Sequence, residues 1–236
     1  MDIKLQKIIE IRGTLILESN LHIGSGNLEM HIGGTDNPII KHPHTQEPYI
    51  PGSSIKGKIR SLLELSTGVA ASAYKNGSDG GISNLNALLK EKNNDMKEAM
   101  ASILKIFGCS NSSKTADSIE TKTAIELGPT RASFADCYLN SDWKNKAIEN
   151  MWPLSVEKQE NSIDRITGVA KSPRVTEVVP SGAKFDFRVT FKIFDNSDEE
   201  LLKMLKEGIE LMQKDAIGGA GSRGYGRVRI ENLHEA

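Results

Sequence analysis

Two segments in which apolar and polar residues alternate place the strongest constraint on what this chain can fold into. Residues 7–19 read KIIEIRGTLILES, and residues 184–194 read KFDFRVTFKIF. A period of two residues is typical of a strand with one buried and one solvent-facing side, so both segments are predicted to be half-buried strands. The residues expected to be buried are Ile9, Ile11, Leu15, Leu17, Phe185, Phe187, Val189, Phe191 and Ile193.

Two other segments repeat their apolar residues with the period of an α-helix. Residues 50–66 read IPGSSIKGKIRSLLELS, where Ser53 or Ser54 is the expected N-cap after a Pro-Gly pair. Residues 197–214 form an amphipathic pattern with acidic residues in the first turn, where they suit the positive end of the helix dipole. Both segments are predicted to be helices that cover a core.

The middle of the chain is less regular. Residues 84–108 favour a helix with a break near 93–95. Residues 109–123 are rich in Ser, Thr and Asn and are expected to be mobile, and residues 131–139 are expected to form a strand. We therefore expect a largely helical insertion between the first helix and the second strand.

Two long excursions interrupt the regular elements. Residues 20–54 form a connection rich in Gly, His and Pro, and such connections in compact domains are usually functional or disordered. Residues 152–182 have the pattern of a protruding hairpin around TGVAKSP. Without these inserts the order strand, helix, strand, strand, helix, strand approximates a ferredoxin-like α+β sandwich, a fold also found in RNA-recognition domains. Because that fold hosts many functions, the function has to be argued from the site.

Composition narrows the class of protein. The chain has 236 residues, a net charge of −1 and 38% hydrophobic residues, which suits one large globular domain. No run approaches the roughly 18 apolar residues of a membrane helix, and residues 1–13 lack the apolar core of a signal peptide. Cys109 and Cys137 are too few for a disulfide framework and are expected to be reduced. We expect a cytoplasmic protein without a membrane partner.

The start of the helix at Ser53 is the first candidate site. Free backbone N–H groups, two hydroxyls at Ser53 and Ser54, and the cations Lys56, Lys58 and Arg60 together favour an anion. Helical spacing places the first and the last of these cations on one flank, which favours them as a pair. The alternative is an ordinary capped helix with solvated cations.

A glycine-rich loop near the C-terminus is the second candidate site. Residues 217–230 read IGGAGSRGYGRVRI, so Gly219, Gly221 and their neighbours let backbone approach closely to another group. Arg223 has no acid nearby in sequence, which favours a phosphate ligand. Tyr225 could stack on a base or simply pack. The alternative is a tight turn between a helix and a strand.

Isolated residues carry weaker signals. Asp36 lies between Gly-rich and Pro-containing pieces, where an Asx-turn is the usual role, and no base or metal partner is evident in the sequence. Arg131 opens a strand and is either a phosphate contact or an edge cation. The spacing of the histidines in the same connection as Asp36 does not match a zinc motif. Those histidines are His22, His31, His42 and His44.

Three blocks taken together resemble one family. They are HIGSG followed by TDNPIIKHPHTQEPYIPGSSIKGKIRSLLE, then NSIDRITGVAKSPRVTEVVPSGAKFDF, then IGGAGSRGYGRV. These blocks resemble the RAMP superfamily, and within it the backbone subunit of the Csm complex, the type III-A CRISPR–Cas effector. The first and third blocks are shared by many RAMP proteins, whereas the second is far more specific to this subunit.

The resemblance implies a single RAMP domain over 1–236. It implies a ferredoxin-like (RRM-like) palm, a lid-like helical insertion and a protruding thumb hairpin. The implied palm comprises 1–20, 50–66, 124–150 and 183–236. The other implied parts are the loop with the candidate catalytic Asp at 21–49, the insertion at 67–123 and the thumb at 151–182. Several copies would stack head to tail in a helical filament along a crRNA guide, beside other Csm-complex subunits.

The resemblance also implies roles for individual residues. Asp36 would be the catalytic residue, cleaving target RNA with a divalent metal ion, Mg²⁺ or Mn²⁺, and serving as a transient metal ligand. The implied RNA-binding residues are His22, Ser53, Ser54, Lys56, Lys58, Arg60, Arg131, Gly219, Gly221 and Arg223. The implied thumb residues are Ile166, Val169, Pro173 and Arg174. Two alternatives remain open: a non-catalytic crRNA-binding scaffold, and a RAMP endonuclease that processes precursor CRISPR RNA.

Overall fold

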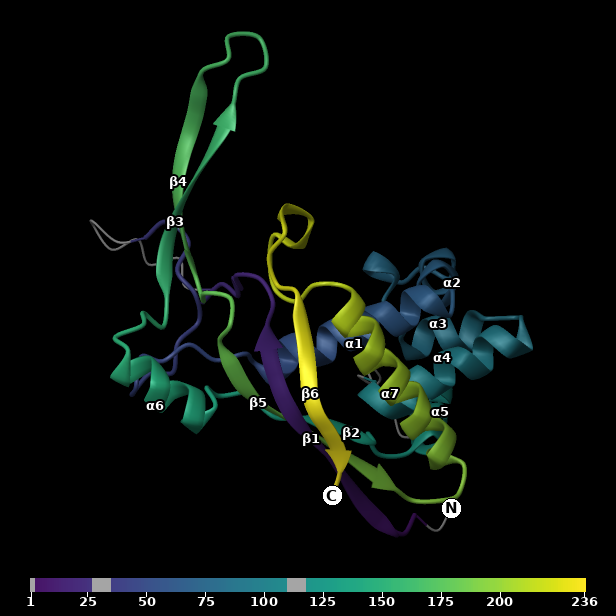
Figure 1. Cartoon of the computed structure of the whole chain (residues 1–236). Helices are drawn as coiled ribbons and strands as arrows, with labels where there is room; N and C mark the ends of the chain where they lie inside the picture. Colours follow the sequence, from purple (N-terminus) through teal and green to yellow (C-terminus); the bar gives the residue numbers. More distant parts are fainter. Residues whose placement is uncertain (1–2, 27–34, 110–117) are drawn as a thin grey trace.

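A four-stranded antiparallel sheet lies at the centre of the molecule, with strand order β2-β5-β1-β6 (Figure 1). The structure is a computed structural model that describes residues 3–26, 35–109 and 118–236. The mixed class of strands and helices predicted from the sequence is confirmed. The strands of this sheet are β1 (Lys7–Leu17), β2 (Ala132–Phe134), β5 (Lys184–Ile193) and β6 (Val228–Glu235).

The two alternating segments pair with each other in the centre of the sheet. β1 lies antiparallel to β5, with Ile11 opposite Val189 and Leu15 opposite Phe185. All nine apolar residues expected on the inner faces of these strands are buried, at 4% exposed or less. The opposite face carries polar side chains, including Arg12 directly opposite Arg188. The predicted half-buried strands are therefore confirmed.

Two helices cover the buried side of the sheet. α1 (Gly52–Ser66) and α7 (Asp198–Lys214) pack against each other and share one hydrophobic core with the strands (Figure 1). A Cβ atom added at Gly208 would lie 2.6 Å from the side chain of Ile59, so glycine is needed for the two helices to approach this closely. Both helices were predicted from their apolar period, and both are confirmed.

The N-cap predicted for α1 is wrong. The helix begins at Gly52 with Pro51 as its N-cap residue, and no side chain of this segment caps it. Instead, the Asp136 carboxylate accepts the N–H of Gly52 at 2.7 Å. The cap thus comes from a segment 84 residues away, which local sequence patterns do not reveal.

A helical insertion follows α1, as expected. The predicted break near 93–95 lies at 91–93, between two helices. The prediction of a mobile segment over 109–123 is wrong at its C-terminal end, because a helix begins at Ile119. Residues 110–117 of that segment lie outside the described residues. The elements of the insertion are α2 (Val69–Lys75), the 3₁₀ turn η1 (Asp79–Gly81), α3 (Leu85–Lys90), α4 (Asn94–Phe107) and α5 (Ile119–Leu127).

The segment expected to be a strand over 131–139 is mostly irregular. Only β2 is a regular strand, while Cys137 and Leu139 make isolated bridges to Ile50 and Phe185. Helix α6 (Ser141–Glu149) follows and was not predicted from the sequence. Its low apolar content hid it, because only Ala147 of its residues is buried.

A two-stranded hairpin projects away from the sheet (Figure 1). It consists of β3 (Val156–Ile163) and β4 (Ala170–Val178), and it confirms the hairpin expected within 152–182. At its base, Asn37 forms a parallel bridge to Thr176, and Leu21 pairs with Val179. The hairpin is thus tied to the long connection that precedes α1.

The structure bears on two sequence-based expectations, the absence of a membrane-spanning helix and the reduced state of the cysteines. None of the described helices is long and apolar enough to cross a membrane. Both cysteines are free, and burial raises the pKa of the Cys137 thiol to about 12, so this thiol stays protonated near neutral pH.

Candidate cleavage site and nucleic-acid interface

Asp36 lies on an extended segment at the base of the hairpin. This exposed carboxylate accepts the N–H of Val175 through Oδ2 at 2.8 Å. The flanking backbone is held on both sides, since Asn37 N–H donates to the carbonyl of Val175 at 3.1 Å and Glu177 N–H donates to the carbonyl of Asn37 at 3.0 Å. The side chain is therefore fixed through one oxygen, while Oδ1 has no hydrogen bond within the described part of the chain.

Glu177 is the buried group that holds this segment in place. Its Oε1 lies 2.5 Å from Lys41 Nζ and accepts the Ser155 hydroxyl at 2.6 Å, and its Oε2 accepts the N–H of Ile39 at 3.2 Å. Burial alone would raise the pKa of Glu177, but the hydrogen bonds from Lys41 and Ser155 outweigh it and lower the pKa. A single charged carboxylate thus joins the connection, the hairpin and the segment before it.

A second carboxylate lies beside the Asp36 segment. The hydroxyl of Thr35 donates to Oε1 of Glu157, on β3. Sequence reasoning missed this residue, because Glu157 is 121 positions away from Asp36 and only the pairing of the hairpin brings it near. No signal in a single sequence would have found it.

Metal-binding capacity at this site is limited. No cluster of three or more His, Cys, Asp or Glu side chains suited to a metal occurs among residues 3–26, 35–109 and 118–236. Asp36 offers one open carboxylate oxygen. That donor set fits a hard divalent cation which keeps most of its ligands as water or phosphate oxygens, as Mg²⁺ commonly does.

His22 links the hairpin base to the glycine-rich loop. Its Nδ1 lies 2.8 Å from the carbonyl of Glu177, so Nδ1 carries the proton in this contact. Its own carbonyl accepts the N–H of Gly219 at 2.8 Å. His22 and Asp36 both hydrogen-bond to the backbone of β4, at Glu177 and at Val175.

The three cations of α1 do not act as one group. Lys58 pairs with Asp215 at 2.6 Å. Arg60 pairs with the buried Glu64 at 2.9 Å and also donates to Ser83, so it faces the insertion. Lys56 alone of the three has no ion pair among the described residues. The prediction that Lys56 and Arg60 together bind one anion is therefore wrong, because the Arg60 side chain contacts Glu64 and Ser83 instead.

The anion site expected at the start of α1 is also corrected. The first N–H of the helix is occupied by the Asp136 carboxylate, a negative group supplied by the protein itself. This carboxylate satisfies an otherwise free donor and neutralises part of the positive dipole end. Ser53 is exposed and Ser54 is half-buried, and neither side chain caps the helix.

Arg131 does not reach an RNA-accessible surface. Its side chain is 5% exposed and pairs with the fully buried Asp198 at 3.0 Å. Its Nη1 donates to the carbonyls of Leu127 and Pro129, both at 2.7 Å, and its guanidinium lies 5.1 Å from the ring centre of Phe194. The predicted phosphate contact is wrong, since the guanidinium is almost fully buried and its Nε and Nη1 already bind protein groups.

The glycine-rich loop carries the 3₁₀ turn η2 (Gly221–Arg223). Part of its glycine content serves the chain's own packing. A Cβ atom at Gly218 would lie 2.4 Å from the carbonyl of His22, and one at Gly226 would lie 1.9 Å from the carbonyl of Ile217. At Gly219 an added Cβ atom would lie 3.5 Å from the His22 ring, an ordinary contact, so packing does not require glycine there. The tight-turn interpretation accounts for Gly218 and Gly226.

Side chains of this loop contact the hairpin. Arg223 pairs with Glu160 of β3 at 2.8 Å, and the Tyr225 hydroxyl donates to the same carboxylate at 2.9 Å. Tyr225 is 3% exposed, so it packs and offers no face for stacking on a base. Arg223 stays about half exposed.

The tip of the hairpin is apolar and open to solvent. Ile166 is 97% exposed and Val169 is 57% exposed. The turn between the strands is shaped by Asp164, whose carboxylate accepts the N–H groups of Ile166 and Thr167, both at 2.9 Å. Pro173 and Arg174 lie lower on β4 and are exposed.

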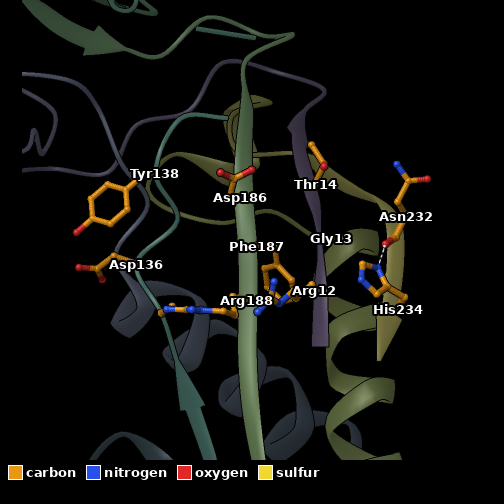
Figure 2. Close-up of a pocket in the computed structure, with 11 residues that line it drawn as sticks. Arg12, Gly13, Thr14, Asp136, Tyr138, Asp186, Phe187, Arg188, Asn232 and His234 are labelled. Carbon is orange, nitrogen blue, oxygen red and sulfur yellow. Dashed lines mark hydrogen bonds between the residues drawn. The ribbon is translucent and has the colours of Figure 1, made fainter. Parts of the chain in front are cut away.

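A separate hollow of about 640 Å³ lies on the outer face of the sheet (Figure 2). Arg12 and Arg188 lie in it side by side, and Glu10 pairs with both. Asp186 in the same hollow accepts a hydrogen bond from Asn140. None of the predicted RNA-binding residues lines this hollow. Its exposed charges are balanced within the protein, which sets this face apart from the hairpin face.

The chain matches the model of the RAMP superfamily over residues 14–229. A Methanothermobacter thermautotrophicus protein named CRISPR system Cms endoribonuclease Csm3 is 35% identical, over 98% of this chain and 86% of its own length. Proteins of the same name from Methanocaldococcus jannaschii and Streptococcus thermophilus are 36% and 33% identical, over 94% and 95% of this chain and 78% and 88% of theirs.

Solved structures agree in fold. A crystal structure of a Csm3–Csm4 subcomplex in the type III-A CRISPR–Cas interference complex matches with a TM-score of 0.55 and 25% identity, over 99% of this chain and 80% of that one. A type III-B Cmr-beta complex bound to cognate target RNA matches in fold alone, with a TM-score of 0.59 and 19% identity over 97% of this chain and 61% of that one. Family model, relatives and fold agree: this chain belongs to the RAMP superfamily.

Proposed function

We propose that this chain is an endoribonuclease and a crRNA-binding backbone subunit of a type III-A CRISPR effector, and that it cleaves target RNA at Asp36. The observation that carries the proposal is the position of Asp36. It lies at the base of a projecting hairpin, held through one carboxylate oxygen with the other open. The relatives are named as endoribonucleases, which supports RNA cleavage as the reaction class.

The architecture is assigned in the same terms. The sheet order β2-β5-β1-β6, with α1 and α7 as its connecting helices, supports a ferredoxin-like palm within a single RAMP domain. The insertion at 67–123 is assigned as the lid and residues 151–182 as the thumb. Residues 21–49 then form the loop that carries the catalytic carboxylate.

The RNA-binding set is smaller than the sequence predicted. It retains Lys56, Lys58, the exposed Ser53 and the half-buried Ser54 of α1 as the surface that follows the guide backbone. It also retains the loop residues Gly219, Gly221 and Arg223, with His22 beneath them. Arg60 and Arg131 are excluded, because their side chains are only 19% and 5% exposed and are held by Glu64 and Asp198. Backbone contacts of this kind follow shape and charge rather than base identity.

The thumb would displace one base pair of the guide–target duplex. Ile166 and Val169 at the exposed tip supply an apolar wedge, and wedges of this kind unstack neighbouring bases. Pro173 and Arg174 lie farther down the same strand and would contact the displaced backbone. Copies of the chain would stack head to tail along the guide, in contact with other Csm-complex subunits, in the cytoplasm.

The chemistry follows from positioning. An unpaired nucleotide beside Asp36 can align its 2′-hydroxyl with the adjacent phosphorus and the departing 5′-oxygen. In this proposal the open Oδ1 of Asp36 would orient the attacking 2′-hydroxyl or hold Mg²⁺ or Mn²⁺. When bound, the metal ion supplies charge stabilisation at the phosphate. A site with one carboxylate and few protein ligands for a metal ion implies a slow nuclease, whose rate depends mainly on how the RNA is positioned.

The decisive experiment compares the assembled effector carrying Asp36→Ala with the wild type on complementary target RNA. We expect cleavage to be lost while crRNA and target remain bound, because Asp36 contributes one side chain and its backbone supports the segment. A target with a 2′-deoxy substitution at the cleaved nucleotide should resist the wild-type complex. Full cleavage by Asp36→Ala would remove the catalytic role and leave the scaffold alternative.

A further inference from the structure

Glu160, on β3, is the point at which the hairpin and the glycine-rich loop meet. Its Oε2 accepts Nη1 of Arg223 at 2.8 Å, and its Oε1 accepts the hydroxyl of Tyr225 at 2.9 Å. Arg174 lies directly opposite on β4, with its Nε 3.6 Å from the same Oε2. The side chain of Glu160 is only 14% exposed. One largely buried carboxylate therefore binds groups from two separate segments.

A second contact strengthens the same junction. Nζ of Lys158 lies 4.6 Å from the ring centre of Tyr225. A cation over an aromatic face is attracted by the ring quadrupole, more strongly where water is excluded. Tyr225 is almost fully buried, so its ring is shielded from water. The junction therefore combines the charged hydrogen bond from Arg223, the hydrogen bond from the Tyr225 hydroxyl and the contact of Lys158 with the Tyr225 ring. In Figure 1 the loop before β6 rises beside the base of the hairpin.

The junction keeps an excess of positive charge. It contains the three cations Lys158, Arg174 and Arg223 and the one carboxylate of Glu160, and 3 − 1 leaves a net charge of +2. The side chains of Arg174 and Arg223 are 47% and 49% exposed. Each guanidinium has five N–H donors, and Glu160 uses only a few of them. Two half-exposed guanidiniums are thus held beside each other with donors to spare.

We propose that Glu160 is a positioning residue for RNA binding. It holds the hairpin against the glycine-rich loop and presents Arg174 and Arg223 as a preformed pair that binds one backbone phosphate of the RNA. The inference rests on the proposed function and deepens it, since it assigns a role to a carboxylate that lies among cations in an RNA-binding region. Preorganised guanidiniums lose less freedom on binding, so they bind phosphate more tightly than free ones.

The rival expectation has the opposite sign. If Glu160 only offsets the charge of its neighbours, its removal would raise the local charge from +2 to +3 and strengthen RNA binding. If Glu160 positions the arginines, its removal weakens binding in spite of the added charge. The direction of the change therefore separates the two possibilities.

The test uses the full chain with Glu160→Gln, which preserves side-chain size and removes only the charge. We measure binding to fluorescein-labelled single-stranded RNA across a series of salt concentrations. Our expectation is a several-fold weaker affinity and a salt slope smaller by about 0.7, which corresponds to one lost phosphate contact on a single strand. Glu210→Gln, on the exposed side of α7, makes the same charge change away from the junction and should leave both quantities unchanged.

A second readout follows the hairpin without RNA. Amide hydrogen exchange within 156–178 should be faster in Glu160→Gln than in the wild type, whereas exchange in β1 and β5 should not change. This pattern would also show that the variant is folded. Tyr225→Phe removes only the hydroxyl bond and should give a smaller change in the same direction.

Several results would overturn the inference. They are an unchanged or tighter affinity for Glu160→Gln, a weaker affinity with an unchanged salt slope, and unchanged exchange in the hairpin. Failure of the proposed function looks different, because the wild-type chain itself would then neither bind the RNA nor cleave target within the assembled effector.

Discussion

At the scale of single residues, Arg131 and Asp198 form a buried ion pair that joins β2 to the start of α7. Asp198 is fully buried, and its second oxygen accepts the N–H groups of Phe194 and Asp195 at 2.8 and 3.4 Å. Every charge in this pair is matched by hydrogen bonds. Such a pair is costly to break, because the remaining partner is left charged without water.

Asp198→Ala is therefore expected to lower the free energy of unfolding by about 3–5 kcal/mol. Urea unfolding followed by circular dichroism measures the change. Asp142→Ala, at an exposed position in the first turn of α6, is a matched control and should change stability by less than about 1 kcal/mol. A loss below 1 kcal/mol for Asp198→Ala would contradict the structural role assigned here to Arg131.

At the scale of elements, α1 shows how one helix distributes three cations among different tasks. Lys58 faces the end of α7 through Asp215, and Arg60 faces the insertion through Glu64 and Ser83. Lys56 remains available to a ligand. Identical charges four residues apart thus have different roles, because each is defined by the element that packs against it.

Lys56→Ala is expected to weaken binding of single-stranded RNA and to reduce the salt slope by about 0.7, as for the loss of one phosphate contact. Stability should barely change, since Lys56 has no ion pair among the described residues. Arg188→Ala serves as the control, because it removes an equally charged, exposed side chain from the outer face of the sheet. If both variants changed the slope equally, the assignment of the RNA to the α1 face would be wrong.

Arg60→Ala separates structural from RNA-binding cations on the same helix. It leaves Glu64 buried without its arginine, so we expect a loss of about 1–3 kcal/mol in the free energy of unfolding. The salt slope of RNA binding should equal that of the wild type. Unfolding in urea and a salt titration on the same sample measure both quantities, and a reduced slope would restore Arg60 to the RNA surface.

At the scale of the whole molecule, the pKa shifts of the carboxyl groups all have the same direction. Among the described residues, every carboxyl group with a shifted pKa has it lowered, through hydrogen bonds and nearby cations. The pKa of Asp164 falls to about 2 because Lys171 and two backbone N–H groups bind it. The groups with lowered pKa are Glu91, Glu160, Asp164, Glu177, Asp195 and Asp215.

Stability should therefore fall on acidification. A carboxyl group whose pKa is lower in the folded state contributes stability above its unfolded pKa of about 4, and loses it as pH falls through the folded pKa. We expect the free energy of unfolding to be nearly constant from pH 7 to about 5 and to decrease below about pH 4. Urea unfolding at successive pH values tests this, and an increase in stability on acidification would contradict it.

Much of this architecture could be predicted from local pattern. Alternation in 7–19 and 184–194 predicted the two central strands, and the helical period predicted α1 and α7. These patterns are informative because each apolar side chain turned to water, and each polar one turned to the core, would destabilise the fold. The hairpin followed from two extended pieces around a turn. Helix α6 was missed, since a helix with a single buried residue carries almost no periodic signal.

The catalytic candidate was accessible only in part. The resemblance to RAMP proteins indicated Asp36, whereas the residues alone suggested an Asx-turn. The partners that hold Asp36 and its segment, Val175 and Glu177, lie about 140 positions away in the sequence. Long-range pairing of this kind depends on how the hairpin meets the connection, and no local spacing encodes it.

The sequence by itself determined the class of fold, the central strands and helices, and the family. These follow from side-chain periodicity and from motifs, which are properties of neighbouring residues. The tertiary structure alone decided which charges face outward: it buried Arg131 against Asp198, turned Arg60 to Glu64, and joined Arg223 to Glu160. The physical reason is that a charge is satisfied by whichever opposite charge the fold brings within a few ångströms, regardless of distance along the chain.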